Sequence, residues 1–162
     1  MAQPAKVSTC IWLETGGLEA VRFWTSLFEG SEIRDEAKFD HLLTGESDAV
    51  LVIDFTLAGT PFQVLQAGPY QEHTDMMSIS VLTEDQAETD RLWDALISGG
   101  GRASQCGWLK DRWGVAWQIV PRRFTELGAS GDKARVGAMM AAMLTMEKLD
   151  IAALEAAYEA DA

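Results

Sequence analysis

The chain has 162 residues, of which 48% are hydrophobic and 23% are charged, which predicts a soluble globular protein with one well-buried core. Its formal net charge of −12 argues against nucleic acid and anionic membrane surfaces as partners, because both are bound through basic patches. No apolar run reaches the roughly 20 residues of a membrane-spanning helix, and the two cysteines make no disulfide framework, so we expect a cytoplasmic protein.

The first half of the chain predicts a strand, a helix and two further strands. Residues 6–13 are rich in β-branched and aromatic side chains, which favours a mostly buried strand. Apolar residues then recur at helical spacing through residues 18–27. The polar stretch 40–48 predicts a loop, and further strands are expected at residues 50–57 and 61–66.

The second half predicts the same order of elements. A strand is expected at residues 78–82 and a helix at residues 85–97, which ends in a glycine-rich turn. Strands around residues 106–110 and 115–120 follow, and Pro121 ends the second of them.

The C-terminal tail differs in composition from the rest of the chain. Residues 132–146 are rich in Ala and Met, with apolar positions spaced for one face of a helix. Asp150 is placed to cap a last helix over residues 151–160. The apolar stripe of this helix is formed by Val136, Met139, Met140 and Met143. It has two interpretations: either it packs in a core or a dimer interface, or it forms a flexible surface that contacts a ligand.

Two segments of the chain are copies of one another. Residues 9–30 align without a gap with residues 78–99, and residues 59–65 align with residues 114–120. The matched positions include a tryptophan in each predicted helix and a glycine after each of them. The duplication predicts two copies of one strand-helix-strands unit related by pseudo-twofold symmetry, and such molecules usually place their site on the symmetry axis.

The duplicated unit resembles the vicinal oxygen chelate superfamily, which includes glyoxalase, bleomycin-resistance proteins and extradiol dioxygenases. Within it, the chain is similar to the 3-demethylubiquinone-9 3-methyltransferase-like family. The stretches that carry this resemblance are Phe23-Trp-Thr-Ser-Leu-Phe28, Leu92-Trp-Asp-Ala-Leu96, Cys106-Gly-Trp-Leu-Lys-Asp111, Gly114-Val-Ala-Trp-Gln-Ile-Val-Pro121 and Met146-Glu-Lys-Leu-Asp-Ile-Ala-Ala-Leu-Glu155.

The resemblance implies an α+β fold, in which two tandem βαβββ repeats form a curved sheet shaped as a cup and a helical tail follows. It implies a single glyoxalase-like domain over residues 1–162. Repeat one is then residues 5–69, repeat two is residues 76–122, and the helical tail is residues 123–162. It also implies a homodimer, and the Ala/Met-rich helix of the tail is a candidate for its interface because small residues allow helices to approach closely.

In the superfamily the first and fourth strands of each repeat line a central cavity. Carried over by the repeat register, the resemblance points to Thr9 and Ser78 on the first strands and to Gln63 and Gln118 on the fourth. These four side chains offer hydrogen-bond donors and acceptors without formal charge, which suits a neutral or weakly polar ligand in an apolar cup. Three further cavity candidates lie in the second repeat: Trp108, Trp113 and Cys106.

Neither a metal ion nor a bound organic cofactor is expected. Two hydroxyls and two amides lack the imidazoles or carboxylates that a divalent metal requires, and the only histidines, His41 and His73, lie in loop-like stretches. A nucleotide-type cofactor needs a glycine-rich turn between a strand and a helix, whereas the glycine run Gly99-Gly100-Gly101 follows a helix.

Cys106 is the one cavity candidate with a nucleophilic side chain. A reactive thiol needs a neighbouring cation or a helix N-terminus to lower its pKa, and no histidine is placed as its base. A structural role is therefore favoured for Cys106.

Three functions fit these residues. The first is a metal-free protein that binds a small, partly apolar molecule of unknown identity in the cavity. The second is an enzyme, either methyltransferase-like as the family label implies or metal-dependent with unusual ligands. The third is a dimeric interaction module with a vestigial pocket, filled by side chains such as Phe62 and Trp117.

Overall fold

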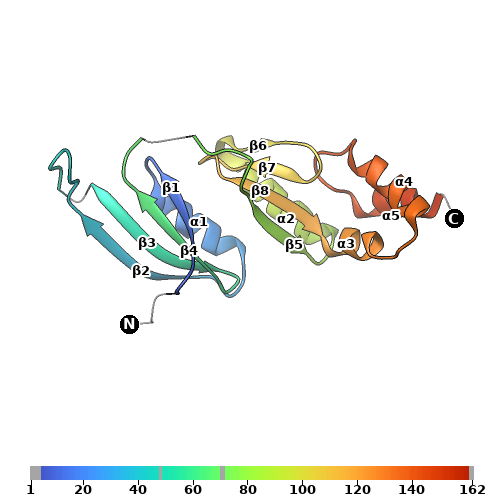
Figure 1. Ribbon diagram of the computed structural model, residues 1–162, viewed down its shortest axis with the longest axis horizontal. Helices are drawn as coiled ribbons and strands as arrows, with labels where there is room; N and C mark the ends of the chain where they lie inside the picture. Colours follow the sequence, from blue (N-terminus) through green and yellow to red (C-terminus); the bar gives the residue numbers. More distant parts are fainter. Residues whose placement is uncertain (1–4, 48, 70–71, 161–162) are drawn as a thin grey trace. The chain divides into compact units, whose positions relative to one another are not determined.

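The computed structural model describes residues 5–47, 49–69 and 72–160 (Figure 1). The chain divides into two compact units, residues 1–71 and residues 72–162. Each unit contains one strand-helix-three-strand module, so the fold is α+β with two tandem βαβββ modules. No helix among the described residues is long and apolar enough to cross a membrane.

Unit 1 is a four-stranded sheet with one helix packed on it. Its elements are β1 (Thr9–Leu13), α1 (Gly17–Leu27), β2 (Glu32–Phe39), β3 (Val50–Leu57) and β4 (Thr60–Gln66). The strand order is β1-β4-β3-β2, with β1 parallel to β4 and the other pairs antiparallel. The βαβββ unit implied a strand here, but residue patterning did not locate β2, because its eight residues are almost all exposed and show no apolar alternation.

Alternation along β3 and β4 creates the core of unit 1. Ile53, Phe55 and Val64 are almost fully buried on one face of the sheet, against Trp24 of α1. The Trp24 and Phe55 rings stack with their centroids 6.1 Å apart. The helix begins close to the sheet, because Gly17 leaves room for β4 and its N–H donates to Oε1 of Gln66 at 2.7 Å.

Unit 2 repeats this plan with shorter outer strands. Its elements are β5 (Ile79–Thr83), α2 (Gln86–Ile97), a short 3-10 turn (Ser98–Gly100), β6 (Arg102–Ala103), β7 (Trp108–Lys110) and β8 (Ala116–Pro121). The strand order is β5-β8-β7-β6, again with one parallel pair, β5 and β8.

A buried carboxylate holds the turn between β7 and β8. Asp111 is 3% exposed, and its Oδ1 accepts hydrogen bonds from the backbone N–H groups of Trp113 and Val115, each at 3.0 Å. Its Oδ2 accepts from the indole Nε1 of Trp117, also at 3.0 Å. Asp111 therefore connects the backbone of the turn to the side chain of Trp117 on β8, which is fully buried in the core.

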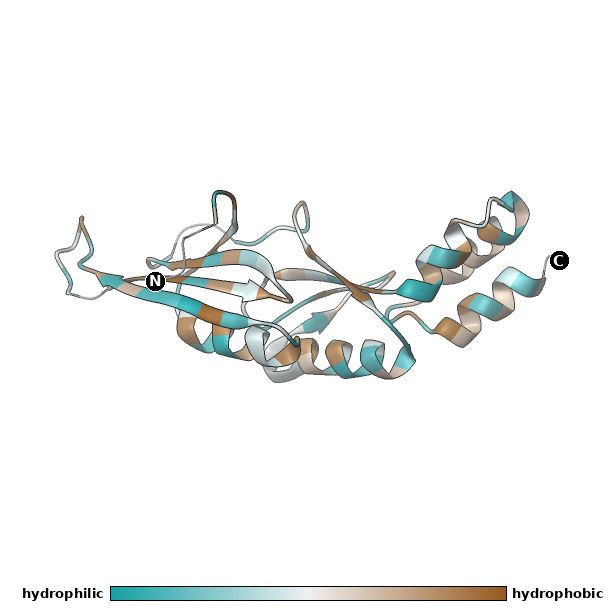
Figure 2. Ribbon diagram, turned by 90° about the horizontal axis from the view of Figure 1, so that it is seen from below, coloured by the Kyte–Doolittle hydropathy of each residue, from teal (hydrophilic) through white to brown (hydrophobic). Residues whose placement is uncertain are grey.

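The helical tail follows β8 and has a small core of its own. It consists of α3 (Arg122–Gly128), α4 (Lys133–Met143) and α5 (Ile151–Ala160), and the last two helices carry both hydrophilic and hydrophobic residues (Figure 2). Four side chains from the tail are buried together: Leu127, Met139, Leu149 and Leu154. The prediction that the methionine stripe packs in a core is thus confirmed for Met139. Residues 161–162, at the end of the tail, lie outside the described residues.

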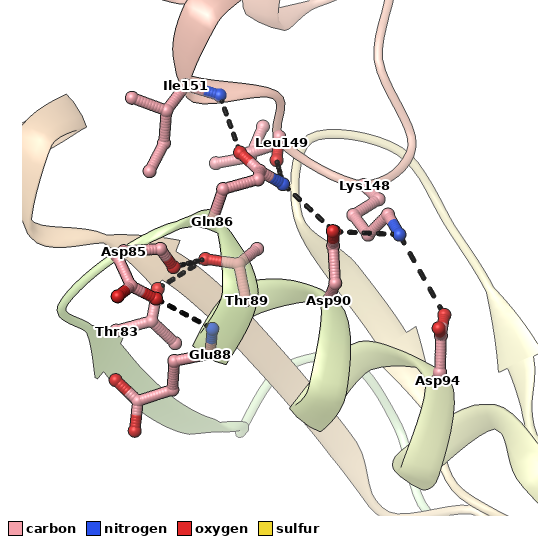
Figure 3. Close-up of polar contacts among 10 residues, drawn as sticks. All are labelled: Thr83, Asp85, Gln86, Glu88, Thr89, Asp90, Asp94, Lys148, Leu149 and Ile151. Carbon is pink, nitrogen blue, oxygen red and sulfur yellow. Dashed lines mark hydrogen bonds and ion pairs between the residues drawn. The ribbon is translucent and has the colours of Figure 1, made fainter.

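The tail is joined to α2 by a polar contact (Figure 3). Gln86 donates from Nε2 to the carbonyl oxygen of Leu149 at 3.2 Å and accepts at Oε1 from the N–H of Ile151 at 2.8 Å. Lys148 forms an ion pair with Asp90 at 2.9 Å. The hydrogen bond between these two side chains lowers the pKa of Asp90 and raises the pKa of Lys148. The pair is therefore stabilised in its charged form.

Candidate functional site

Each sheet has one face covered by its helix and a second face, which we call the open face. On the open face of unit 1, strand pairing places Cys10, Gln63 and Asp54 side by side across β1, β4 and β3. We call these three residues the polar rung. The next residues on the same face, Trp12, Leu65 and Val52, pair in the same register and form an apolar rung beside it.

The polar rung of unit 1 is internally hydrogen-bonded. Nε2 of Gln63 donates to Oδ1 of Asp54 at 2.8 Å. An ionised carboxylate can only accept, so the NH₂ group of the amide faces Asp54. Burial raises the pKa of the Cys10 thiol, and the negative charge of Asp54 raises it further. Cys10 therefore remains a neutral thiol rather than a thiolate nucleophile.

The open face of unit 2 has the same plan. Its polar rung is Ser80, Gln118 and Trp108, across β5, β8 and β7, and its apolar rung contains Leu82 and Val120. Nε2 of Gln118 donates to Oγ of Ser78 at 2.7 Å. Ser78 precedes β5 by one residue and lies two residues before Ser80, so both hydroxyls belong to the same side of the sheet.

The strand register changes the equivalence between the two repeats. Cys10 pairs with Gln63 as Ser80 pairs with Gln118, whereas the sequence alignment matches Thr9 with Ser78. Thr9 pairs with Phe62, on the helix-covered face. This difference arises because the connection between β1 and α1 is one residue longer than the connection between β5 and α2. An alignment that matches the two helices is therefore off by one residue in the strands, and a shift of one residue places every side chain on the opposite face of the sheet.

The structure distributes the remaining candidates over different places in unit 2. Trp108 lies half-buried on the open face beside Gln118. Trp113 lies in the turn after β7, where the Arg112 guanidinium sits 4.2 Å from its ring centroid. Cys106 lies in the turn before β7 with a φ of 60°, not in a strand, and its N–H donates to the carbonyl oxygen of Met146 at 2.7 Å.

Three residues of the open faces were missed in the sequence: Cys10, Asp54 and Ser80. Asp54 carries a visible signal, because it is the one charged residue within the apolar strand 50–57. Phe62 and Trp117, considered as side chains that fill a vestigial pocket, are buried on the helix-covered faces instead. The expectation of one central cavity stays a prediction.

The side chains present do not fit a divalent metal ion. No group of three His, Cys, Asp or Glu residues with metal-binding geometry occurs in the part of the chain that the structure describes. Gln63 and Gln118 are neutral, and their amide nitrogens already donate within their own sheets. His41 uses Nδ1 to accept from the backbone N–H groups of Leu43 and Thr44, which gives it a role in its loop.

The helix N-termini after β1 and β5 do not fit a nucleotide-type cofactor. The first N–H of α1 is bonded to the side chain of Gln66. At α2, Oδ1 of Asp85 accepts from the N–H of Glu88 at 2.8 Å, and Oε2 of Glu88 accepts from the N–H of Glu84 at 2.8 Å. At α2, carboxylates thus occupy the position where a phosphate would bind and would repel it, whereas at α1 the neutral amide of Gln66 already takes the first N–H.

Comparison with known proteins places this arrangement in a family. The sequence profile described as 3-demethylubiquinone-9 3-methyltransferase matches residues 5–120. No curated protein matches the chain. Among solved structures, the PhnB protein from Bacillus cereus is 29% identical, with 72% of this chain and 99% of that chain covered and a TM-score of 0.64.

Two more distant structures share the fold. Protein PA1353 from Pseudomonas aeruginosa is 20% identical, with 72% of this chain and 97% of that chain covered and a TM-score of 0.57. The fosfomycin resistance protein FosX from Listeria monocytogenes is 13% identical, with 72% of this chain and 91% of that chain covered and a TM-score of 0.51. At these identities the likeness concerns the fold alone.

Proposed function

The chain belongs to the 3-demethylubiquinone-9 3-methyltransferase family, within the vicinal oxygen chelate superfamily, and on this premise we propose that it binds a small, partly apolar molecule without a metal ion. The open faces of its sheets are the proposed binding surfaces. In this proposal the protein binds or sequesters its ligand and does not transform it chemically.

One observation carries this proposal: both open faces combine a glutamine-centred polar rung with an apolar rung. In unit 1, Gln63 lies beside Trp12 and Leu65, and in unit 2, Gln118 lies beside Leu82 and Val120. The two glutamines are half-buried, so their amides can orient a ligand while the neighbouring side chains cover its apolar part. Two modules with different sequences share this pattern, which supports a binding role for it.

The chemistry of the same residues favours binding over catalysis. A general base or activated nucleophile needs a titrating side chain within reach of the reacting atom. The centre of each polar rung is a neutral amide, and the thiol of Cys10 has a raised pKa. The one carboxylate of these rungs, Asp54, already accepts a hydrogen bond from Gln63, which engages it in holding the amide. The proposal also includes a homodimer, for which the exposed Met140 of α4 and the exposed Leu144 directly after this helix are candidate contacts.

Native mass spectrometry of protein purified without added metal, together with elemental analysis, tests the proposal. We expect a dimer that retains a small organic molecule and contains no stoichiometric metal. The double variant Gln63→Ala/Gln118→Ala is expected to lose the retained molecule while keeping the circular dichroism spectrum of the wild type. Gln105→Ala, at an exposed glutamine in a turn, is the matched control and should retain it.

Three results would contradict the proposal. Stoichiometric metal would refute the metal-free function. Undiminished retention of the molecule by the double glutamine variant would refute the open faces as its site. A wild-type protein that carries no molecule and takes up none from a panel of small aromatic probes would refute a binding function.

A further inference from the structure

The two polar rungs differ at one position. Asp54 on β3 and Trp108 on β7 both pair directly with the central glutamine of their sheet, so they are structural counterparts. In unit 1 this position carries a negative charge, and in unit 2 it carries an aromatic ring. The difference lies beside the residue through which the proposed function would orient a ligand.

Asp54 controls what Gln63 presents to a ligand. Because the carboxylate takes one N–H of the amide at 2.8 Å, the amide is held with its nitrogen toward Asp54. Within the described ranges, this is the one hydrogen bond of the Gln63 side chain, and its carbonyl oxygen is left as an acceptor. In unit 2, by contrast, Gln118 is held by the neutral hydroxyl of Ser78.

The charge of Asp54 also acts on its surroundings. The half-buried carboxylate raises the pKa of the Cys10 thiol on the far side of the polar rung, in addition to the larger effect of burial. A second negative charge brought onto this rung would experience the same repulsion, whereas a cation would be attracted.

We infer that the open face of unit 1 selects a ligand whose polar group is a cation or a neutral hydrogen-bond donor and rejects an anionic group, and that Asp54 is the residue that sets this specificity. The inference rests on the proposed function, of which it names the ligand class. The donor group would bond to the carboxylate of Asp54 and the carbonyl oxygen of Gln63.

The adjacent apolar rung fixes where the rest of such a ligand would lie. The indole N–H of Trp12 donates to the carbonyl oxygen of Gly68 at 3.0 Å, so the ring offers mainly apolar surface to the open face. Leu65 and Val52 continue this surface across the sheet. A donor or cationic head on a compact apolar body therefore matches the two rungs together.

Three probes with the same apolar body test the inference: 2-phenylethylamine, 2-phenylethanol and 3-phenylpropionate. Each carries a phenyl ring and a two-carbon spacer, and they differ in the charge of the head group. Isothermal titration calorimetry at low ionic strength is expected to show that wild-type protein binds the amine at least about tenfold more tightly than the carboxylate, which corresponds to ~1.4 kcal/mol.

Two variants locate the origin of that preference. Asp54→Asn removes the charge but keeps an oxygen that can accept from Gln63, so the ratio of the two dissociation constants should fall to about threefold or less, since only the charge has gone. Glu29→Gln removes the same charge from an exposed residue after α1 and should leave the ratio unchanged. Raising the ionic strength should lower the wild-type preference only in part, because Asp54 is half-buried.

The outcomes separate this inference from the proposed function. If wild-type protein binds the carboxylate as tightly as the amine, the inference is overturned and the proposed function is not. This measurement does not depend on the folding of any variant. An unchanged ratio in Asp54→Asn also overturns it, because the preference would then come from another residue. Absence of binding by all three probes overturns the proposed function together with the inference.

Discussion

Replacing the buried carboxylate of Asp111 by an amide tests the account of how unit 2 is held together. In Asp111→Asn, the amide oxygen can still accept from the backbone N–H groups of Trp113 and Val115, which now reach Oδ1 at 3.0 Å. The new NH₂ group then replaces Oδ2 and faces the indole N–H of Trp117, where two donors meet.

The magnitude follows from that lost acceptor. A hydrogen bond to a charged group contributes about 1.5–3 kcal/mol, and a buried donor left without a partner costs about 1–3 kcal/mol. The two contributions overlap, so we expect Asp111→Asn to lower the free energy of unfolding by about 2–4 kcal/mol. Because Trp117 is fully buried and Asp111 is 3% exposed, water cannot readily replace the acceptor.

Urea denaturation followed by tryptophan fluorescence and circular dichroism measures this effect. With a slope of about 2 kcal/mol per molar urea, the midpoint should fall by roughly 1–2 M. Asp94→Asn is the control, since its exposed carboxylate lies 3.8 Å from Lys148 and should contribute less than about 0.5 kcal/mol. Equal midpoints for Asp111→Asn and wild type would refute the reasoning from buried hydrogen bonds.

Two other predictions concern packing and pH. Gly101→Ala should destabilise the protein by about 1–3 kcal/mol in the same denaturation assay, because its Cβ would lie 2.6 Å from a backbone carbonyl oxygen. Gly137→Ala, in α4 with nothing within 4 Å of the added Cβ, should instead stabilise it by up to ~1 kcal/mol; the same sign for both would contradict the packing argument. For the pair of Lys148 and Asp90, the lowered pKa of Asp90 contributes stability above the ordinary carboxyl pKa that is lost as the pH falls through the lowered value. The raised pKa of Lys148 contributes stability below the ordinary lysine pKa that is lost as the pH rises through the raised value. Lys148→Gln should therefore lose less stability than wild type on acidification, and parallel curves of urea midpoint against pH would refute the pair's contribution.

The two halves of the candidate site were accessible from the sequence to different degrees. Gln63 and Gln118 were identified through the repeat and lie at equivalent places on the open faces, each bonded within its own sheet. Thr9 was matched to the wrong counterpart because an ungapped alignment of the helices carries a one-residue error into the strand. Asp54 was passed over because its role depends on the strand beside it.

The strand β2 and the turn at Cys106 show where patterning gives no signal. The residues of β2 are almost entirely exposed, so the strand forms through its backbone pairing with β3 and not through apolar alternation. Cys106 lies within a stretch that has the composition of a strand, yet its left-handed backbone and its bond to Met146 place it in a turn held by the tail. Both features depend on partners that are distant in the sequence.

The sequence by itself determined the family, the duplicated modules and the positions of the helices α1 and α2, whereas the short helix α3 was not predicted. These properties follow from apolar spacing within a few turns or strands, and the predicted helices at residues 18–27 and 85–97 agree with α1 and α2 to within one residue. The tertiary structure decided which side chains share an open face, because that depends on strand register. A shift of one residue exchanged Thr9 for Cys10 beside Gln63, and pairing with β3 brought the charge of Asp54 to the same rung.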